Sequence, residues 1–442
     1  MLYALGVVIF ALGILISIAL HEVGHLVGAK KFGVKVTQYM VGFGPTVWSR
    51  KRGDTEYGVK AVPFGGYIRM IGMVPPNDTS KPSRWPRRMA SAVEDFRQTS
   101  RCEVGPGDEE REFYRLTPGK KMIVMLGGPA MNLVIYLVLS MALLTLMGQK
   151  NPTTTVESVS QCVVAANSAD AAAGTCPASA PDAPAAQAGL RPGDKIVAID
   201  GAAITSWDQA VAIIERSAGQ RLTMTVQRDG AQRQLSITPV ENTKYANDTG
   251  TATFVAGYIG VSPTERYQPL SVTAAPGQIG SQISSAFRAL GSYPQKIGSL
   301  WGTVFDGKPR DPNGAIGVVG LGRLGGDVAD SHVLDLQDKI YFLFGLLASV
   351  NLLLCLFNLL PLLPLDGGHV LGALIESVRR GAARLRARRA TAGPDGTRAA
   401  RPPIFVDTAQ FLPVMYAVTS VLVLVTMLVI YADIVKPITI GG

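Results

Sequence analysis

Charged residues are scarce in this sequence: Asp, Glu, Lys and Arg make up 17% of it, against 47% for hydrophobic residues. A water-soluble globular protein has about 25% charged residues. The deficit therefore favours segments buried in a lipid bilayer over an ordinary soluble protein. The net charge of +9 would suit nucleic acid, but no nucleic-acid-binding motif of basic and aromatic residues accompanies it, so we expect no nucleic-acid partner.

Cysteine and histidine are also rare, with four residues of each. No two cysteines form a Cys-x-x-Cys pair, which argues against a zinc site built from thiolates. Cys162 and Cys176 lie close together in the sequence. We predict a disulfide between them, because their segment is expected outside the cytosol, where disulfides persist.

Four apolar stretches are long enough to cross a bilayer, which takes about 20 helical residues. We expect transmembrane helices at residues 1–27, 122–147, 341–363 and 411–431. The first stretch begins without a basic region and has no small-residue cleavage site. We therefore interpret it as a retained membrane helix and not as a signal peptide.

The charges in the connections predict how the helices are oriented. Segment 28–121 has 18 Lys and Arg against 10 acidic residues, and segment 364–403 has eight arginines against three acids. Segment 148–340 has 15 basic and 17 acidic residues. Because positive loops stay on the cytoplasmic side, we expect the first and third connections inside and the middle one outside. The basic residues would then face anionic lipid headgroups.

Each connection has its own character. Residues 31–73, within the expected cytoplasmic loop 28–121, alternate like strands and predict a membrane-associated, re-entrant β segment. Residues 150–262 predict an extracytoplasmic β-rich module with a short helix and an Asp229-Gly230 hairpin turn. We expect an amphipathic linker at 263–340 and an Arg-rich loop at 364–403.

His21-Glu22-Val23-Gly24-His25 fits the metal-binding pattern His-Glu-x-x-His. The spacing of four residues places both imidazoles on one face of a helix, where they can share a metal ion. Glu22 lies beside them and can accept a proton from an activated water molecule. Ionisable residues are costly inside an apolar helix, which favours a functional role over a mere position at the membrane surface.

A catalytic zinc ion takes three protein ligands and leaves one position open. The third ligand here is either His369 or a carboxylate. Asp366 follows the third apolar stretch at its cytoplasmic end, and the charge pattern brings His21 and His25 to the same membrane face. These two lines favour Asp366, and we expect His369 to have a supporting or structural role.

The sequence resembles the site-2 protease family of intramembrane metalloproteases over essentially its whole length. The resemblance lies in four motifs: His21-Glu22-x-x-His25, Gly42-x-Gly44, Gly128-Pro129-x-x-Asn132 and Asn358-x-x-Pro361-x-x-Pro364-x-Asp366-Gly367. The turn Gly189-Leu190-x-x-Gly193-Asp194 is similar to one in PDZ domains. A single such module and the outer cysteine pair are most like the actinobacterial branch.

The resemblance implies a polytopic α-helical membrane protein of four transmembrane helices, a membrane-associated β segment and one extracytoplasmic PDZ-like α+β domain. It implies a bacterial inner-membrane location, with Zn²⁺ bound by His21, His25 and Asp366 and with Glu22 as catalytic base. Asn358 would hold the substrate backbone. Gly42, Phe43 and Gly44 would offer a strand edge to an unwound substrate.

Under this interpretation the protein cleaves single-span membrane proteins such as anti-sigma factors in regulated intramembrane proteolysis. Clearance of signal-peptide remnants is an alternative within the same chemistry. A non-catalytic membrane scaffold that binds peptides through its PDZ-like module belongs to a different class, and intact His21, Glu22 and His25 argue against it. A metal transporter would need ionisable residues in several helices, and the second and fourth stretches have none.

Overall fold

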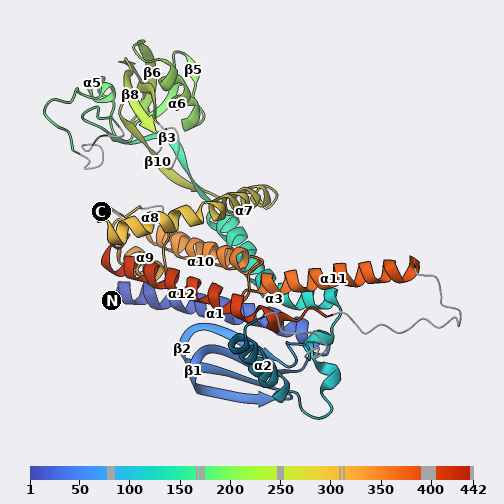
Figure 1. The fold of residues 1–442 in the computed structure, drawn as a ribbon. Coiled ribbons are helices and arrows are strands. Elements are labelled where there is room, and N and C mark those ends of the chain that lie inside the picture. The colour runs from blue at the N-terminus through green and yellow to red at the C-terminus, as the bar shows by residue number, and fades with distance from the viewer. Residues whose placement is uncertain are drawn as a thin grey trace. The chain divides into compact units, whose positions relative to one another are not determined.

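The computed structural model describes residues 1–76, 85–165, 168, 175–245, 253–307, 310–311, 314–389 and 405–438. The chain forms two compact units (Figure 1). Residues Met1–Leu143 and Val272–Gly442 make up the first, which we call the helical unit. Residues Leu144–Ser271 make up the second, the β unit.

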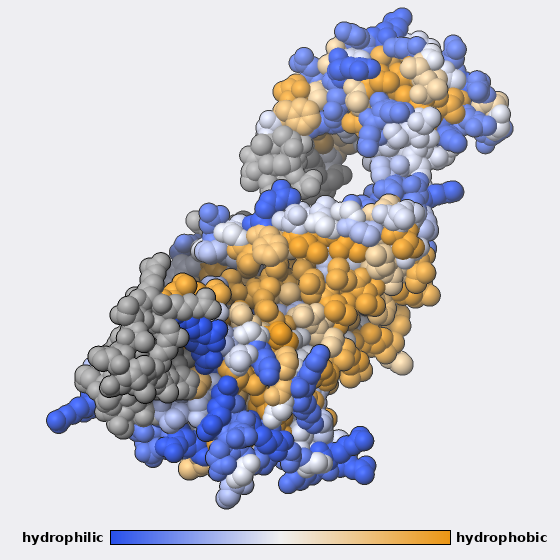
Figure 2. Space-filling view, turned by 90° about the vertical axis from the view of Figure 1, so that its right-hand side faces the viewer, coloured by the Kyte–Doolittle hydropathy of each residue, from blue (hydrophilic) through white to orange (hydrophobic). Residues whose placement is uncertain are grey.

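Four helices of the helical unit are long and apolar enough to cross a membrane, as the sequence predicts. They are α1 (Leu2–Lys31), α3 (Pro118–Ala142) with the π-helical turn that follows it, α10 (Leu336–Asn358) and α12 (Leu412–Val435) with the 3₁₀ turn before it. Figure 2 shows a broad hydrophobic area on this unit, bordered by hydrophilic side chains. Such a surface suits contact with lipid.

The third span begins and ends earlier than the predicted 341–363. Helix α10 ends at Asn358, and residues 359–365 form a turn before the next helix. Pro361 and Pro364 lie in this turn, and proline cannot donate the backbone hydrogen bond that a continuing helix requires. The helix therefore ends where the prolines begin.

Helices α1 and α3 touch through their backbones. A Cβ atom on Gly24 of α1 would lie 2.1 Å from the carbonyl oxygen of Gly127, and one on Gly127 would lie 2.3 Å from that of Gly24. Paired small residues of this kind let membrane helices approach closely. The contact lies within the His21–His25 motif and therefore brings α3 directly against it.

The predicted β segment is present as two long, bent strands, β1 (Val36–Arg52) and β2 (Thr55–Met70), which lie beside α1 (Figure 1). Residues 36–41 pair on one side with residues 66–70 and on the other with residues 56–59. The distal part of β1 pairs only with the first part of β2. The two strands thus make four antiparallel arms, and residues 66–70 form an outer arm.

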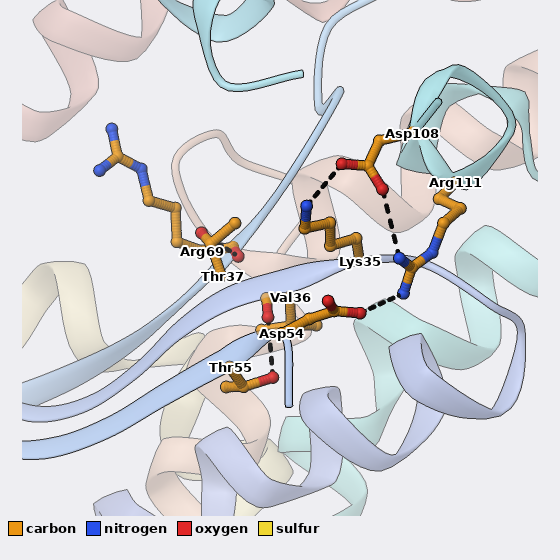
Figure 3. A network of polar contacts seen from close by, with 8 residues as sticks. All are labelled: Lys35, Val36, Thr37, Asp54, Thr55, Arg69, Asp108 and Arg111. Atoms are coloured by element: carbon orange, nitrogen blue, oxygen red, sulfur yellow. Dashed lines mark hydrogen bonds and ion pairs between the residues drawn. The ribbon is translucent and has the colours of Figure 1, made fainter. Parts of the chain in front are cut away.

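An ion-pair network fixes the base of this sheet (Figure 3). Asp108 binds both Lys35 and Arg111, and Arg111 also binds Asp54 at 2.7 Å. The hydroxyl of the fully buried Thr55 donates to the carbonyl of Val36 at 2.8 Å. These contacts hold the segment after α2 (Arg87–Cys102) against the sheet. The expected loop 28–121 is therefore largely ordered structure.

Two other predicted connections are helical. The expected linker 263–340 contains α7 (Ala275–Gly291), α8 (Tyr293–Phe305) and α9 (Val318–Asp330). Helix α9 packs against α1, where a Cβ atom on Gly6 would lie 2.5 Å from the carbonyl oxygen of Gly325. The linker thus contributes α9 to the helical core, and residues 275–305 are helical, as the spacing of apolar residues at 271–305 predicts.

The expected Arg-rich loop 364–403 begins with a helix, α11 (Asp366–Arg389). After two glycines its sequence consists mainly of Ala, Leu and Arg, which are strong helix formers. Residues 390–403 of the expected loop lie outside the described residues.

The β unit is built around an antiparallel sheet in the order β10-β3-β4-β6-β7, with β5 paired to β4 and a separate β8–β9 hairpin. The strands are β3 (Gln149–Val159), β4 (Lys195–Ile199), β5 (Ala202–Ala203), β6 (Leu222–Arg228), β7 (Ala231–Ile237), β8 (Val240–Tyr245), β9 (Thr253–Tyr258) and β10 (Val261–Gln268). The short helix α5 (Pro184–Gln187) and helix α6 (Trp207–Arg216) complete it. Ile196, Ile199 and Met224 lie in its core.

Local sequence signals in the β unit are confirmed. Asp229 and Gly230, with φ of 52° and 80°, turn β6 into β7, as the Asp-Gly pair predicts. Ser206 caps α6 by accepting from the backbone N–H of Gln209. The predicted disulfide joins Cys162 to Cys176, whose Cα atoms lie 5.8 Å apart.

A buried ion pair holds the 189–194 turn of the β unit. Asp194 is fully buried and accepts from the guanidinium of Arg228 and from the backbone N–H of Arg191. Burial by itself would raise the pKa of Asp194, but the bonds from Arg228 and Arg191 outweigh it and lower this pKa. The carboxylate therefore stabilises the folded unit above the unfolded pKa of Asp, which is about 3.9.

We expect the β unit to lose this contribution as the pH falls from about 4 through the lowered pKa of Asp194. Asp194→Asn should therefore lower the melting temperature of the full chain at pH 7 and flatten its dependence on pH in that acidic range. Glu157→Gln, at an exposed position of β3, is the matched control. Equal melting temperatures and pH profiles for Asp194→Asn and the control would contradict the assignment.

Candidate metal centre

Two imidazoles and one carboxylate meet in the helical unit. His21 and His25 lie one turn apart on α1, with their Nε2 atoms 3.2 Å apart. Oδ2 of Asp366, the first residue of α11, lies 3.4 Å from Nε2 of His21 and 3.3 Å from that of His25. The predicted third residue therefore does reach the histidine pair, although 341 positions separate Asp366 from His25 (366 − 25 = 341).

The donor set fits a zinc ion. The three ligand atoms lie within 4.8 Å of one another, and Oδ2 of Asp366 is buried without a hydrogen-bond partner. A buried carboxylate oxygen in this state calls for a cation. Two imidazole nitrogens and one carboxylate oxygen form the three-ligand set of a catalytic zinc site with one open position. His369 is outside this group among the described residues.

Helix α3 forms the wall behind the two histidines. His25 lies with Nδ1 at 2.9 Å from the carbonyl oxygen of Val124. A carbonyl can only accept, so Nδ1 carries the proton. Nε2 then directs its lone pair toward the space shared with His21 and Asp366, which together with His25 we call the ligand group. Contacts of this kind orient metal-binding histidines in many metalloproteins.

Asn132 orients the imidazole of His21, as Val124 orients that of His25. Its side-chain amide lies 3.1 Å from His21 Nδ1 and is almost fully buried, and its oxygen has no partner in the rotamer with nitrogen facing the ring. For Nε2 of His21 to bind a metal, Nδ1 must carry the proton. A half-turn of the amide then places the oxygen where it can accept from Nδ1–H. Asn132 therefore contacts one of the two motif histidines, beyond joining two helices.

Gly128 supplies the space that the imidazoles occupy. A Cβ atom at this position would lie 2.3 Å from Nε2 of His25 and 2.6 Å from Nε2 of His21. Only glycine fits, because the α3 backbone runs directly against the rings. The sequence pattern Gly128-Pro129-x-x-Asn132 contained this information, but its role depends on the packing of α3 on α1.

Glu22 lies between the histidines and the β segment. It is half-buried, and a Cβ atom on Gly66 would lie 3.1 Å from its Cγ. Gly66 begins the outer arm of β2. An acidic side chain thus lies next to the two histidines and contacts the outer arm, where the backbone of Ile68 hydrogen-bonds it.

The predicted substrate-binding residues lie at two places. Gly42 and Gly44, with φ of 93° and 84°, make the bend in β1, next to the pairing of Val41 with Gly66. Between them Phe43 is 47% exposed and stacks on Tyr67. Asn358 is half-buried at the last position of α10. The structure therefore places the β1 bend next to the arm that contacts Glu22.

Comparison with known proteins decides the family. The model of peptidase family M50 matches residues 9–392, which include the whole ligand group. The chain belongs to peptidase family M50. It is 35% identical to the zinc metalloprotease Rip1 of Mycobacterium tuberculosis strain H37Rv, over 99% of both chains. It is 32% identical to Rip1 of Mycolicibacterium smegmatis over the full length of both.

A more distant relative is the zinc metalloprotease RasP of Geobacillus kaustophilus, 25% identical over 81% of this chain and 86% of that protein. Together with the family match, these relatives make the chain a zinc metalloprotease of the site-2 protease type. Its four apolar helices make this M50 peptidase a multi-pass membrane protein.

The position of Gly128 gives a sharp test of the metal centre. We expect Gly128→Ala to lower zinc affinity at least tenfold, because the added methyl group would overlap the two imidazoles. Gly119→Ala is the matched control, since a Cβ atom there, on the same helix, meets nothing within 4 Å. Zinc content after chelator competition measures the difference, and wild-type retention in Gly128→Ala would contradict the geometry.

Proposed function

We propose that this M50 peptidase is an intramembrane endopeptidase, which cleaves single-span membrane proteins such as anti-sigma factors during regulated intramembrane proteolysis. One observation carries the proposal: the two histidines lie on α1, a helix whose outer surface is apolar and exposed. Ile16, Leu20 and Val27, on both sides of the motif in α1, are 59%, 37% and 59% exposed. A hydrophobic substrate segment that spans the bilayer would therefore lie at the same membrane depth as the metal centre.

In this proposal His21, His25 and Asp366 hold the zinc ion. When bound, zinc polarises the scissile carbonyl and makes water acidic enough to attack at neutral pH. Glu22 is the general base that takes the proton from the attacking water and passes it to the leaving nitrogen. Val124 and Asn132 keep the two imidazoles oriented throughout.

The substrate must be unwound, because the carbonyls of a helix are engaged in hydrogen bonds. We place its extended stretch along residues 66–70, the outer arm that contacts Glu22. An added strand would be held by main-chain hydrogen bonds. Gly42, Phe43 and Gly44 would lie at the end of this strand edge, and the amide of Asn358 would bind the substrate backbone.

For location, we propose the bacterial cytoplasmic membrane, with the β unit on the extracytoplasmic side. The disulfide between Cys162 and Cys176 supports this side, since disulfides persist in oxidising compartments. The arginines from Arg379 onward, after the metal ligand Asp366, support a cytoplasmic position for the end of α11.

The β unit acts as a PDZ-like gate in this proposal. Recruitment of a peptide carboxylate would need free N–H groups in the turn 189–194. The N–H groups of the five non-proline residues there already donate within the unit, to acceptors on Ala185, Ala186, Val156, Arg191 and Asp194. Size exclusion of substrates with a bulky outer domain is therefore the better supported role.

The catalytic assignment predicts that Glu22→Gln keeps the fold and the zinc but loses cleavage of a model membrane peptide. Loss of a positioned acid–base group typically costs about 10²–10⁴-fold in rate. Zinc content and melting temperature report the intact site, and a turnover assay in detergent reports the chemistry. Cleavage at the wild-type rate by Glu22→Gln would rule out this mechanism.

The gating assignment predicts that the enzyme without most of its β unit cuts substrates that still carry an outer domain. Val156 pairs with Pro263, so replacing residues 157–262 by an Asn-Gly turn retains the β3–β10 stem. The same deletion combined with Glu22→Gln controls for contaminating proteases. If the shortened enzyme cuts trimmed substrate normally but still rejects the untrimmed one, the β unit is not the gate.

A further inference from the structure

One face of α3 contacts the helices that carry all three metal-binding residues. Lys121, Val124, Gly128 and Asn132 are spaced by three, four and four residues, so they lie along one side of the helix. Val124, Gly128 and Asn132 contact the histidines of α1 directly. Lys121 instead contacts α11, the helix that begins with Asp366.

The contact from Lys121 is a buried ion pair. Its Nζ donates to Oε2 of Glu376 at 2.7 Å, and the two side chains are 8% and 1% exposed. Arg380 pairs with the other oxygen of Glu376 at 2.6 Å. The ring of Phe405 lies against both cations: its centroid is 5.4 Å from Nζ of Lys121 and 5.2 Å from Cζ of Arg380. Lys121 and Glu376 are thus shielded from water, while Arg380 is 21% exposed.

The pair fixes α11 along its length. Glu376 lies ten residues beyond Asp366, about 15 Å further along the helix. On α3, Lys121 lies seven residues before Gly128, about 10 Å away. Gly128 faces the metal ligands at one end, and Lys121 holds Glu376 at the other. Helix α3 thus constrains α11 at two positions along its length, near Asp366 and at Glu376.

Asp366 cannot shift independently of α11. A Cβ atom on Gly367 would lie 2.3 Å from the carbonyl oxygen of Leu360, and one on Gly368 would lie 2.7 Å from the carbonyl carbon of Leu362. The first turn of α11 is therefore packed against the turn before it. Any change in the position or angle of α11 relative to α3 would move the Asp366 carboxylate relative to His21 and His25.

We propose that Lys121 and Glu376 are a positioning pair, which sets the place of Asp366 and thereby the affinity for zinc. Neither residue touches the ligand group, so neither is catalytic. The proposal rests on the assignment of Asp366 as a ligand, which Asp366→Ala tests separately through loss of zinc. It predicts that breaking the pair weakens metal binding more than its effect on folding would explain.

A second buried ion pair in the helical unit provides a matched control. Arg310 and Asp433 are 6% and 2% exposed and lie 2.8 Å apart. Asp433 also accepts from the backbone N–H groups of Gly317 and Gly320 at the start of α9. Asp433 thus joins α12 to Arg310, in the segment before α9, and to the start of α9 itself. Neither α12 nor α9 carries a predicted metal ligand. A general loss of buried ion pairing would affect both pairs alike.

The experiment compares Lys121→Met, Glu376→Gln and Arg310→Met in the full chain purified in detergent. Zinc affinity is measured by competition with a fluorescent chelator, the melting temperature without zinc by thermal unfolding, and kcat and KM on a model membrane peptide. We expect Lys121→Met and Glu376→Gln to lower zinc affinity by about tenfold, the lower end of the 10–100-fold that follows loss of a direct outer contact to a metal ligand, because the pair acts on Asp366 only through α11. Their kcat should fall at saturating zinc, with KM unchanged.

Arg310→Met should lower the melting temperature and leave zinc affinity within twofold of the wild type. Lys121→Arg, which keeps the charge, should recover much of the zinc affinity that Lys121→Met loses. Wild-type zinc affinity in both Lys121→Met and Glu376→Gln would overturn the proposal. Failure of both variants to fold would also overturn it, because the pair would then serve the fold and not the metal.

Discussion

The backbone contact between α1 and α3 at Gly24 and Gly127 is the constraint on which the metal centre depends. Imidazoles on an apolar helix need hydrogen-bond partners, and lipid offers none. The contact brings the α3 backbone close enough for Val124 to accept from His25 and for Asn132 to reach His21. A larger residue at either glycine would separate the helices and remove both partners.

Helix α3 also positions the carboxylate of Asp366, which lies far along the chain from the two histidines. Asp366 lies at the start of α11, after a proline-containing turn that ends the third span. Its place depends on the packing of α11 along α3, where the Lys121–Glu376 pair lies. Burying two charges is costly unless they are paired and hydrogen-bonded, so this contact admits little variation. Helix α3 thus organises the site without supplying a ligand.

The β unit follows a different logic. It has its own apolar core, its own disulfide and a turn whose donors are all used internally. Two adjacent strands, β3 and β10, carry the chain into and out of it. Such a module can be large and stable without taking part in chemistry, which agrees with a role in selecting substrates by size.

The sequence alone determined the features that depend on neighbouring residues. The spacing of His21 and His25 places both imidazoles on one helix face, the apolar runs specify four spans, and Asp229-Gly230 specifies a hairpin, because each is a matter of local periodicity or backbone conformation. Only the tertiary structure decided which atoms surround His21, His25 and Asp366. Gly128 belongs to a sequence motif, but its close approach to the imidazoles exists only once α3 is packed against α1. Lys121 has no local signal for its role, since its buried ion pair forms only when α3 meets α11.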